Sequence, residues 1–253
     1  MKQLLNKLIN IFNYEIVKKN SWYQKQLNYI AEINEEEENL IKNISKFSMC
    51  SSLNHWALIQ SLKHISKCKI DGDIVEAGVY KGGNLMLMSH FVDKFNLKKK
   101  IYAYDTFEGM PLENKNIDVD FNNKSANDTR KQYIEGKWCY ASLDNVKKNL
   151  SEFDLKFEDK INFIKGKVEE TLTFDKNLPK KISLLRLDTD FYESTKIELE
   201  VLYPKLEKNG ILIIDDYGHW KGAKKAVDEY FRTDQKFRFF HRIDHTSRLY
   251  IKE

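Results

Sequence analysis

Two stretches decide the fold: GILIIDDYGHW, from Gly210 to Trp220, and ISLLRLDTD, from Ile182 to Asp190. Each is an apolar run of strand length that ends abruptly in carboxylates, as expected of a strand buried on both faces whose carboxyl end opens into a site. Unpaired carboxylates beside a core are costly, so we expect Asp188, Asp215 and Asp216 to share a counter-charge. A hard divalent cation with oxygen ligands is the simplest one. The alternative is that each Asp is a turn residue or a helix cap.

Further strand and helix signals alternate on both sides of these runs. Besides the two quoted runs, the predicted strands are Asp73–Val79, Lys100–Phe107, Lys160–Lys165, Phe237–Ile243 and Arg248–Lys252. Helices are predicted over Asn84–Phe95, Ser142–Phe153 with Ser142 as its cap, Val168–Leu172, Phe191 to about Leu206, and Gly222–Phe231. Alternating strands and helices imply a parallel sheet, and the last two runs, joined by a turn, imply an antiparallel hairpin at its edge. The predicted class is therefore α/β.

The signals around the helix that follows Asp188 divide the acidic residues between two roles. Asp190 precedes the helix and Glu193 follows three residues later, which is a capping-box arrangement. We therefore assign Asp190 to capping and Asp188 to chemistry. At the far end, Asn209-Gly210 is expected to terminate the helix before the next strand.

Turns after the first two predicted strands carry weaker signals. Tyr80-Lys81-Gly82-Gly83 joins a strand to a helix, and glycines there let a backbone approach a ligand, but the spacing is not GxGxxG. Asp105 ends the second strand, where a doubly wound fold hydrogen-bonds a ribose, and it is equally suited to a turn. The polar stretch from Glu108 to Tyr140, which includes Trp138, is long enough to predict a lid over the site.

Composition bounds the function classes. The chain has 253 residues, with 42% hydrophobic and 32% charged residues and a net charge of +4, and its basic residues form no block. It is therefore long enough for one large α/β domain, and it is not expected to bind nucleic acid. Three cysteines without a CxxC pair indicate neither a disulfide framework nor a zinc site, and they favour the cytoplasm.

The N-terminal part reads as helical. Its first apolar residues repeat at helical spacing and predict an amphipathic helix, which favours a homo-oligomer; they are Leu4, Leu5, Leu8, Ile11 and Phe12. No apolar run approaches the roughly 20 residues needed to span a bilayer. We expect residues 1–70 to form a helical cap or oligomerisation segment and residues 71–253 to form the main domain. His55 and His64 lie alone in a helical segment and are interpreted as structural.

Five strands alternating with helices and followed by two adjacent strands resemble the seven-stranded sheet of the Rossmann-like class I S-adenosylmethionine-dependent methyltransferases. Longer motifs narrow the resemblance to the macrocin O-methyltransferase family, whose members methylate sugar hydroxyls on macrolide antibiotics. The motifs are GDIVEAGVYKGG, YDTFEGMP, LLRLDTDFYEST, LYPKL and ILIIDDYGHWKGAKKAVDEY, between about Leu53 and Tyr230.

The resemblance implies two cofactors, S-adenosylmethionine and Mg²⁺. Glu76 and Gly78 would line the methionine end of the first, Asp105 would hold its ribose hydroxyls, and the turn Gly166-Lys167-Val168 would border its adenine. The whole set implied for this cofactor is Glu76, Gly78, Tyr80, Asp105, Thr106, Gly166, Lys167 and Asp188. The family's magnesium ligands match Asp188, Asp215 and Asp216.

The implied reaction is Mg²⁺-dependent transfer of a methyl group to a sugar hydroxyl. Either Asp188 or His219 would take the proton, and the choice stays open. The acceptor would be a nucleotide sugar, a surface polysaccharide or a natural-product glycoside. A Lys-, Asn- and Ile-rich composition favours the first two over a macrolide.

Three other functions compete with this one. Asp188-Thr189-Asp190 is a DxD triplet, which in glycosyltransferases holds the metal of a nucleotide sugar, but the triplet does not account for Asp215-Asp216. An apolar strand followed by DxDxxxxT resembles the nucleophile motif of haloacid dehalogenase phosphatases, where the motif comes early in the domain, whereas this one comes late. A non-catalytic binding domain would have little need for such concentrated negative charge.

Overall fold

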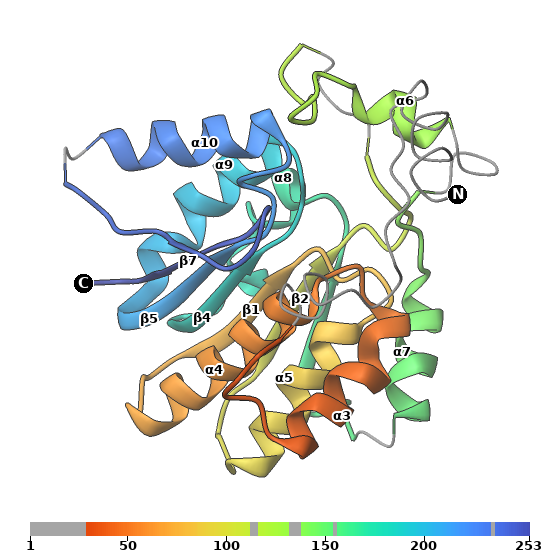
Figure 1. Cartoon of the computed structure of the whole chain (residues 1–253), viewed down its shortest axis with the longest axis vertical. Helices are drawn as coiled ribbons and strands as arrows, with labels where there is room; N and C mark the ends of the chain where they lie inside the picture. Colours follow the sequence, from red (N-terminus) through yellow and green to blue (C-terminus); the bar gives the residue numbers. More distant parts are fainter. Residues whose placement is uncertain (1–28, 112–115, 132–137, 154–155, 234–235) are drawn as a thin grey trace, which may run out of the picture. The chain divides into compact units, whose positions relative to one another are not determined.

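The computed structural model describes residues 29–111, 116–131, 138–153, 156–233 and 236–253 (Figure 1). Residues 35–253 form one compact unit, and the description below is of that unit. The amphipathic helix predicted around Leu4 to Phe12 lies outside the described residues, and the division predicted at residue 70 stays a prediction. None of the helices in the described ranges combines the length and hydrophobicity that a bilayer crossing requires.

A seven-stranded sheet runs through the unit in the order β3-β2-β1-β4-β5-β7-β6. Its strands are β1 (Asp73–Ala77), β2 (Ile101–Asp105), β3 (Ile161–Lys165), β4 (Ile182–Leu187), β5 (Leu206–Ile214), β6 (His241–Arg242) and β7 (Arg248–Ile251). The first five strands pair in parallel, β7 pairs antiparallel with β5, and β6 pairs antiparallel with β7. This confirms the predicted mostly parallel sheet with an antiparallel hairpin at its edge.

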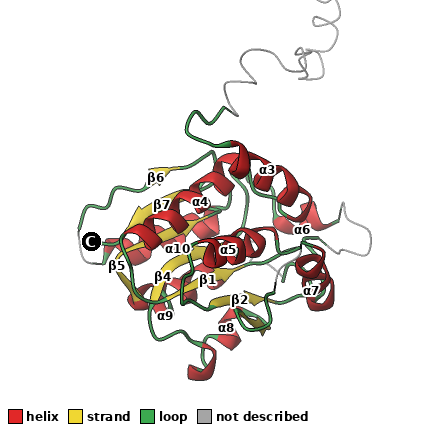
Figure 2. Ribbon diagram, turned by 90° about the horizontal axis from the view of Figure 1, so that it is seen from below, coloured by secondary structure: helices red, strands yellow, loops and turns green. Residues whose placement is uncertain are grey.

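Helices cover both faces of the sheet (Figures 1 and 2). They are α3 (Glu35–Ile44), α4 (Ser52–Lys67), α5 (Gly83–Lys94), α6 (Ala126–Arg130), α7 (Leu143–Glu152), α8 (Val168–Thr171), α9 (Tyr192–Val201) and α10 (Lys221–Arg232). α3, α4 and α5 pack together on one face, and α8, α9 and α10 pack together on the other. Ser142 caps α7 as predicted, because its hydroxyl accepts a hydrogen bond from the Asn145 amide at 3.2 Å.

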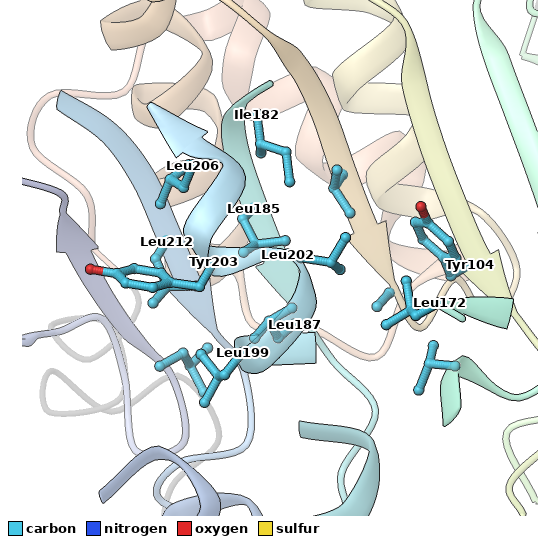
Figure 3. Packing of buried hydrophobic residues seen from close by; sticks show 14 of the residues in the cluster. Tyr104, Leu172, Ile182, Leu185, Leu187, Leu199, Leu202, Tyr203, Leu206 and Leu212 are labelled. Atoms are coloured by element: carbon cyan, nitrogen blue, oxygen red, sulfur yellow. The ribbon is translucent and has the colours of Figure 1, made fainter. Parts of the chain in front are cut away.

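The core follows from the apolar strands. All six residues of β4 are buried, so this central strand is enclosed on both faces as its sequence predicts. On the α9 side, Leu185 and Leu187 of β4 pack with Leu199 and Leu202 (Figure 3). Truncating a buried leucine of this kind to alanine costs about 2–5 kcal/mol of stability.

Several predicted boundaries are wrong. The strand predicted over Phe237–Ile243 is reduced to β6, His241–Arg242. The helix after β4 ends at Val201, and a short 3₁₀ turn over Tyr203–Lys205 follows, because Pro204 lacks an amide donor and cannot continue the helix. Asn209 and Gly210 do not terminate the helix, since both lie inside β5, where the Asn209 amide donates to the carbonyl of Lys252 at 2.6 Å.

The strand order places a crevice between β1 and β4. β2 and β3 lie on one side of β1, whereas β4 and β5 lie on the other, so the chain leaves the carboxyl ends of β1 and β4 towards opposite faces. Ligands of doubly wound sheets bind in such a crevice.

Candidate active site

A cavity of about 440 Å³ opens at the carboxyl ends of β1, β2, β4 and β5. It brings together most of the residues singled out in the sequence; the following line it: Gly78, Tyr80, Asp105, Thr106, Gly166, Lys167, Asp188, Asp215, Asp216 and His219. Glu76 is not among the described lining residues, since it is fully buried behind the cavity wall. Side chains from strands far apart in the sequence thus meet in one space.

The turn after β1 forms one side of the cavity. Gly78 has φ +87°, and a Cβ built on it would lie 1.9 Å from the Asp188 carbonyl oxygen, so only glycine fits where this turn crosses the tip of β4. Gly82, with φ +91°, precedes the first residue of α5. The amide-rich start of a helix therefore faces the cavity, which favours a polar or anionic group there.

Asp105, at the tip of β2, is held by backbone amides. Its Oδ2 accepts hydrogen bonds from the amides of Val79 at 2.7 Å and Tyr80 at 3.2 Å, and its Oδ1 accepts one from Phe107 at 2.7 Å. Burial raises the pKa of this carboxyl group, and the backbone donors oppose that rise. A carboxylate oxygen has capacity for more than one donor, so Asp105 can hold the β1 turn and still accept from a ligand hydroxyl.

A buried arginine that the sequence analysis missed lies behind the cavity. Arg186 of β4 is fully buried, and its guanidinium contacts Glu76 at 3.2 Å, Asp188 at 2.6 Å and Asp215 at 2.9 Å. Glu76 also accepts from Asn84 Nδ2 at 2.9 Å, and burial raises its pKa to about 7. Arg186 is thus a counter-charge that the protein itself supplies to these carboxylates, whereas the sequence analysis predicted only a bound divalent cation.

The acidic side of the cavity contains a compact carboxylate cluster. Ligand oxygens of Asp188, Asp190 and Asp216 lie within 4.8 Å of one another. Burial raises the pKa of all three groups; it raises that of Asp190 to about 7, and the neighbouring carboxylates add to the rise at each of them. Asp216 Oδ2 is buried without a hydrogen-bond partner. Such an all-oxygen donor set fits a hard divalent cation such as Mg²⁺.

Asp215 is placed differently from its neighbour. Its Oδ1 accepts from Arg186, from Ser247 Oγ at 3.0 Å and from the side-chain amide of Asn54. These contacts tie Asp215 to α4 and to the turn before β7.

Asp190 is not the helix cap that its sequence position suggested. The N-cap residue of α9 is Phe191, whose own side chain forms no capping hydrogen bond. Asp190 adopts a left-handed φ of +68° and lies in the carboxylate cluster. The first amide of α9, from Tyr192, instead donates to Asp118 Oδ1 at 2.8 Å. Asp118 belongs to the long loop, so the capping-box pattern was wrong about which acid serves the helix.

His219 lies at the acidic end of the cavity among aromatic rings. Its imidazole packs edge-on against Trp220 at 4.9 Å and Phe121 at 5.6 Å between ring centroids. Trp220 in turn packs against Trp138, at 6.0 Å. Burial lowers the pKa of His219 below its ordinary value of 6.5, so its imidazole is neutral at neutral pH and can accept a proton.

The described parts of the 108–140 loop pack against α9 and α10. Val119 accepts a hydrogen bond from the Lys221 amide at 2.9 Å, and Asp120 forms a β-bridge with Trp220. Met110, Pro111 and Trp138 line the cavity. The loop therefore contributes to the walls of the site, and its movement as a lid stays a prediction.

The sheet order and the crevice between β1 and β4 place this chain in the class I S-adenosylmethionine-dependent methyltransferase fold. The solved structure of the O-methyltransferase NovP shares this arrangement, with a TM-score of 0.69 and 28% identity over 81% of this chain and 82% of that one. The profile of the macrocin-O-methyltransferase (TylF) family matches residues 19–252, and the chain belongs to that family.

Curated relatives from two actinomycetes are similar over part of their length. Demethyldecarbamoylnovobiocin O-methyltransferase of Streptomyces niveus is 30% identical over 181 residues, which are 68% of this chain and 65% of that protein. Mycinamicin III 3''-O-methyltransferase of Micromonospora griseorubida is 29% identical over 163 residues, 64% of this chain and 61% of that protein. The matched regions thus span just under two thirds of the relatives.

Proposed function

We propose that this protein transfers a methyl group from S-adenosylmethionine to a hydroxyl of a sugar or glycoside, with Mg²⁺ held at the acidic end of the cavity. Family membership and the names of the relatives support the reaction class. The observation that carries the proposal is the cavity itself, because one space joins a backbone-held carboxylate at β2 to a carboxylate cluster at β4 and β5.

The cofactor side is preorganised by the protein. Asp105 would accept from the ribose hydroxyls, the Gly78 turn would leave room for the methionine end, and Gly166-Lys167 would border the adenine. When bound, S-adenosylmethionine supplies an electrophilic methyl group. Glu76, which does not line the cavity, would act on that end of the cofactor through Asn84, which does.

The metal would be held by Asp188 and Asp216, with Asp190 and Asp215 as the candidates for a third carboxylate. Asp190 is already gathered with the first two, whereas Asp215 is paired with Arg186. When bound, Mg²⁺ neutralises the cluster and polarises oxygens near it. That neutralisation would offset the burial that now raises the pKa of these carboxyl groups.

Two groups of the chain can take the proton of the acceptor hydroxyl, namely Asp188 at a carboxylate oxygen and His219 at an imidazole nitrogen. Both line the cavity, and the lowered pKa of His219 leaves it in the proton-accepting form at neutral pH. Of the two rings that pack against His219, Trp220 is buried and Phe121 is exposed, so the imidazole is only partly enclosed. The choice between the two residues is decided by a pH-rate profile, described below.

The acceptor is proposed only as a sugar hydroxyl. The two relatives are named as O-methyltransferases of demethyldecarbamoylnovobiocin and of mycinamicin III, while the composition of this chain favours a nucleotide sugar or a surface polysaccharide. Nothing in the comparisons supports the glycosyltransferase alternative. The structure gathers Asp216 with both acids of the DxD triplet, and a triplet alone does not explain that third carboxylate.

The test is calorimetric titration of S-adenosylhomocysteine into the purified protein, with and without Mg²⁺. We expect binding to the native chain and to Asp188→Asn, and weaker Mg²⁺ binding in Asp188→Asn. Asp71→Asn is the matched control, because Asp71 is an exposed aspartate whose ion pair with Lys181 lies on the surface. Failure of the native chain to bind S-adenosylhomocysteine would refute the methyltransferase proposal.

A further inference from the structure

We propose that Glu198 is a positioning residue of the metal cluster, which holds Thr189 so that the carboxylates of Asp188 and Asp190 face the cavity. This inference rests on the proposed Mg²⁺ site. It assigns a role to a buried glutamate that no motif in the sequence singled out.

The contact that carries the inference joins α9 to the tip of β4. Thr189 Oγ1 lies 3.0 Å and 3.1 Å from the two carboxyl oxygens of Glu198. Glu198 is 0% exposed, and no lysine, arginine or histidine forms an ion pair with it in the described ranges of the chain. Thr189 is therefore the polar group that satisfies this buried side chain.

Thr189 is fixed to α9 through its backbone as well. Its carbonyl oxygen accepts a hydrogen bond from the Phe191 amide at 2.8 Å and another from Ser194 Oγ at 3.3 Å. Ser194 and Glu198 are four residues apart, so both lie on the buried face of α9. The residue between the two aspartates is thus bound to the helix at its side chain and at its carbonyl.

Anchoring the middle residue determines where its neighbours point. Because the Thr189 side chain is turned to α9, Asp188 and Asp190 present their carboxylates on the other side, where they meet Asp216. Asp190 adopts a left-handed φ of +68°, which is strained for a non-glycine residue and persists only where the surroundings enforce it. The anchor from Glu198 is one such constraint.

The chemistry of Glu198 suits this role. Burial raises the pKa of its carboxyl group well above the ordinary value, which favours the uncharged form of the acid beneath the cluster. A neutral acid and a glutamine can form similar hydrogen bonds, whereas an alanine forms none. If Glu198 acts by holding Thr189, its replacement by glutamine should therefore preserve metal affinity and its replacement by alanine should not.

The test compares the Mn²⁺ affinities of the native chain and its variants. Mn²⁺ alone is titrated into each full-length protein, and the concentration of free Mn²⁺ is measured by electron paramagnetic resonance. We expect Glu198→Gln to bind like the native chain and Glu198→Ala to bind about 10- to 100-fold more weakly, as is typical when the support of a metal ligand is removed. Thr189→Val should also weaken Mn²⁺ binding. Thr189→Ser, which keeps the hydroxyl group, should bind Mn²⁺ like the native chain. Thermal unfolding of each variant shows which of them are folded.

Glu37→Ala is the matched control. Glu37 is a buried glutamate of α3 paired with Lys63, and it does not line the cavity, so its loss should lower stability without changing Mn²⁺ affinity. Native-like affinity in folded Glu198→Ala and Thr189→Val would overturn the inference while leaving the metal site intact. Absence of Mn²⁺ binding by the native chain would overturn both the inference and the proposed metal, and the two failures are therefore distinguishable.

Discussion

Two acidic strand tips face each other across the cavity, and the protein treats them in opposite ways. At β2, Asp105 receives three backbone amides, so its charge is satisfied before any ligand arrives. At β4 and β5, Asp188, Asp190 and Asp216 crowd together, and Asp216 keeps a buried oxygen without a hydrogen-bond partner. The difference supports the proposed division of roles, in which the first tip accepts from the hydroxyl groups of a ligand and the second holds a cation.

The two tips also differ in what their preorganisation costs. Backbone amides at β2 offset the desolvation of one carboxylate, whereas at β4 and β5 each added carboxylate increases the repulsion among the others. Arg186 offsets part of that repulsion at Asp188 and Asp215. A bound cation would offset the remainder, so substitutions at the two tips are expected to have separable effects.

The largest effect is expected at the cation tip. Asp188→Asn removes a charge that Arg186 contacts and that the proposed Mg²⁺ would contact. We expect methyl transfer to fall by about 100-fold or more, since a metal supplies several kcal/mol of transition-state stabilisation. S-adenosylhomocysteine affinity should fall by less than this, because Asp188 is only one of the residues implied for that cofactor. Steady-state kinetics with varied Mg²⁺, alongside calorimetry, measures both, and a parallel loss of cofactor affinity would show that the two tips are not separate sites.

The next effect concerns the proton acceptor. If His219 is the base, its neutral form is required, so the native rate should fall as pH drops below its pKa, which burial has lowered from 6.5. His219→Asn should then lower the rate by about 100-fold and remove that acid limb. His64→Asn, which changes a histidine outside this cavity, is the control. An unchanged acid limb in His219→Asn would leave Asp188 as the base.

A smaller effect is expected at the amide-held tip. Asp105→Asn turns an NH₂ group towards backbone amides that the carboxylate now accepts on both oxygens. S-adenosylhomocysteine affinity should weaken about tenfold or more, because hydrogen bonds to charged groups are worth about 1.5–3 kcal/mol. Mn²⁺ affinity measured on the same protein should be unchanged, and a large change would contradict the separation of the tips.

The last effect is on stability and not on binding or activity, and it tests whether burial beside Arg186 keeps His55 uncharged. Burial and then Arg186 lower the pKa of His55 from 6.5 to about 4, so the unfolded chain binds more protons between these values. Stability is therefore fully present above pH 6.5 and falls towards pH 4, with a slope of at most about 1.4 kcal/mol per pH unit. Urea unfolding of His55→Gln between pH 4 and pH 7 should show a shallower dependence. An identical slope in the variant would locate the titrating group elsewhere.

The strands, their order of occurrence and the acidic tips could be predicted from the sequence because each rests on a local pattern. β4 and β5 are apolar runs ending in Asp, and Ser142 caps a helix that begins at the next residue. Arg186 escaped notice because two of its three acidic partners, Asp215 and Glu76, lie 29 and 110 residues away, and only the sheet brings them together.

Local patterns also misled where a distant residue took over. A capping box at Asp190 and Glu193 is a local signal, but Asp118, which is 74 residues from Tyr192, supplies the acceptor, and this leaves Asp190 to join the carboxylate cluster. The predicted helix end failed because a turn signal at Asn209-Gly210 was given more weight than Pro204. Asp118 was visible in the sequence but its contact with Tyr192 was not, whereas Pro204 acts locally and needs no partner.

Gly78 sets a limit on how this protein can be redesigned. Any side chain at that position would collide with the backbone of Asp188, so a library that randomises the turn after β1 would lose nearly every clone that changes it. Diversity aimed at new acceptors is better placed at Met49, Met110 and Thr246, which line the same cavity and lie outside that backbone crossing. Because of this close contact, the turn at Gly78 cannot be varied, whereas the other three lining positions can.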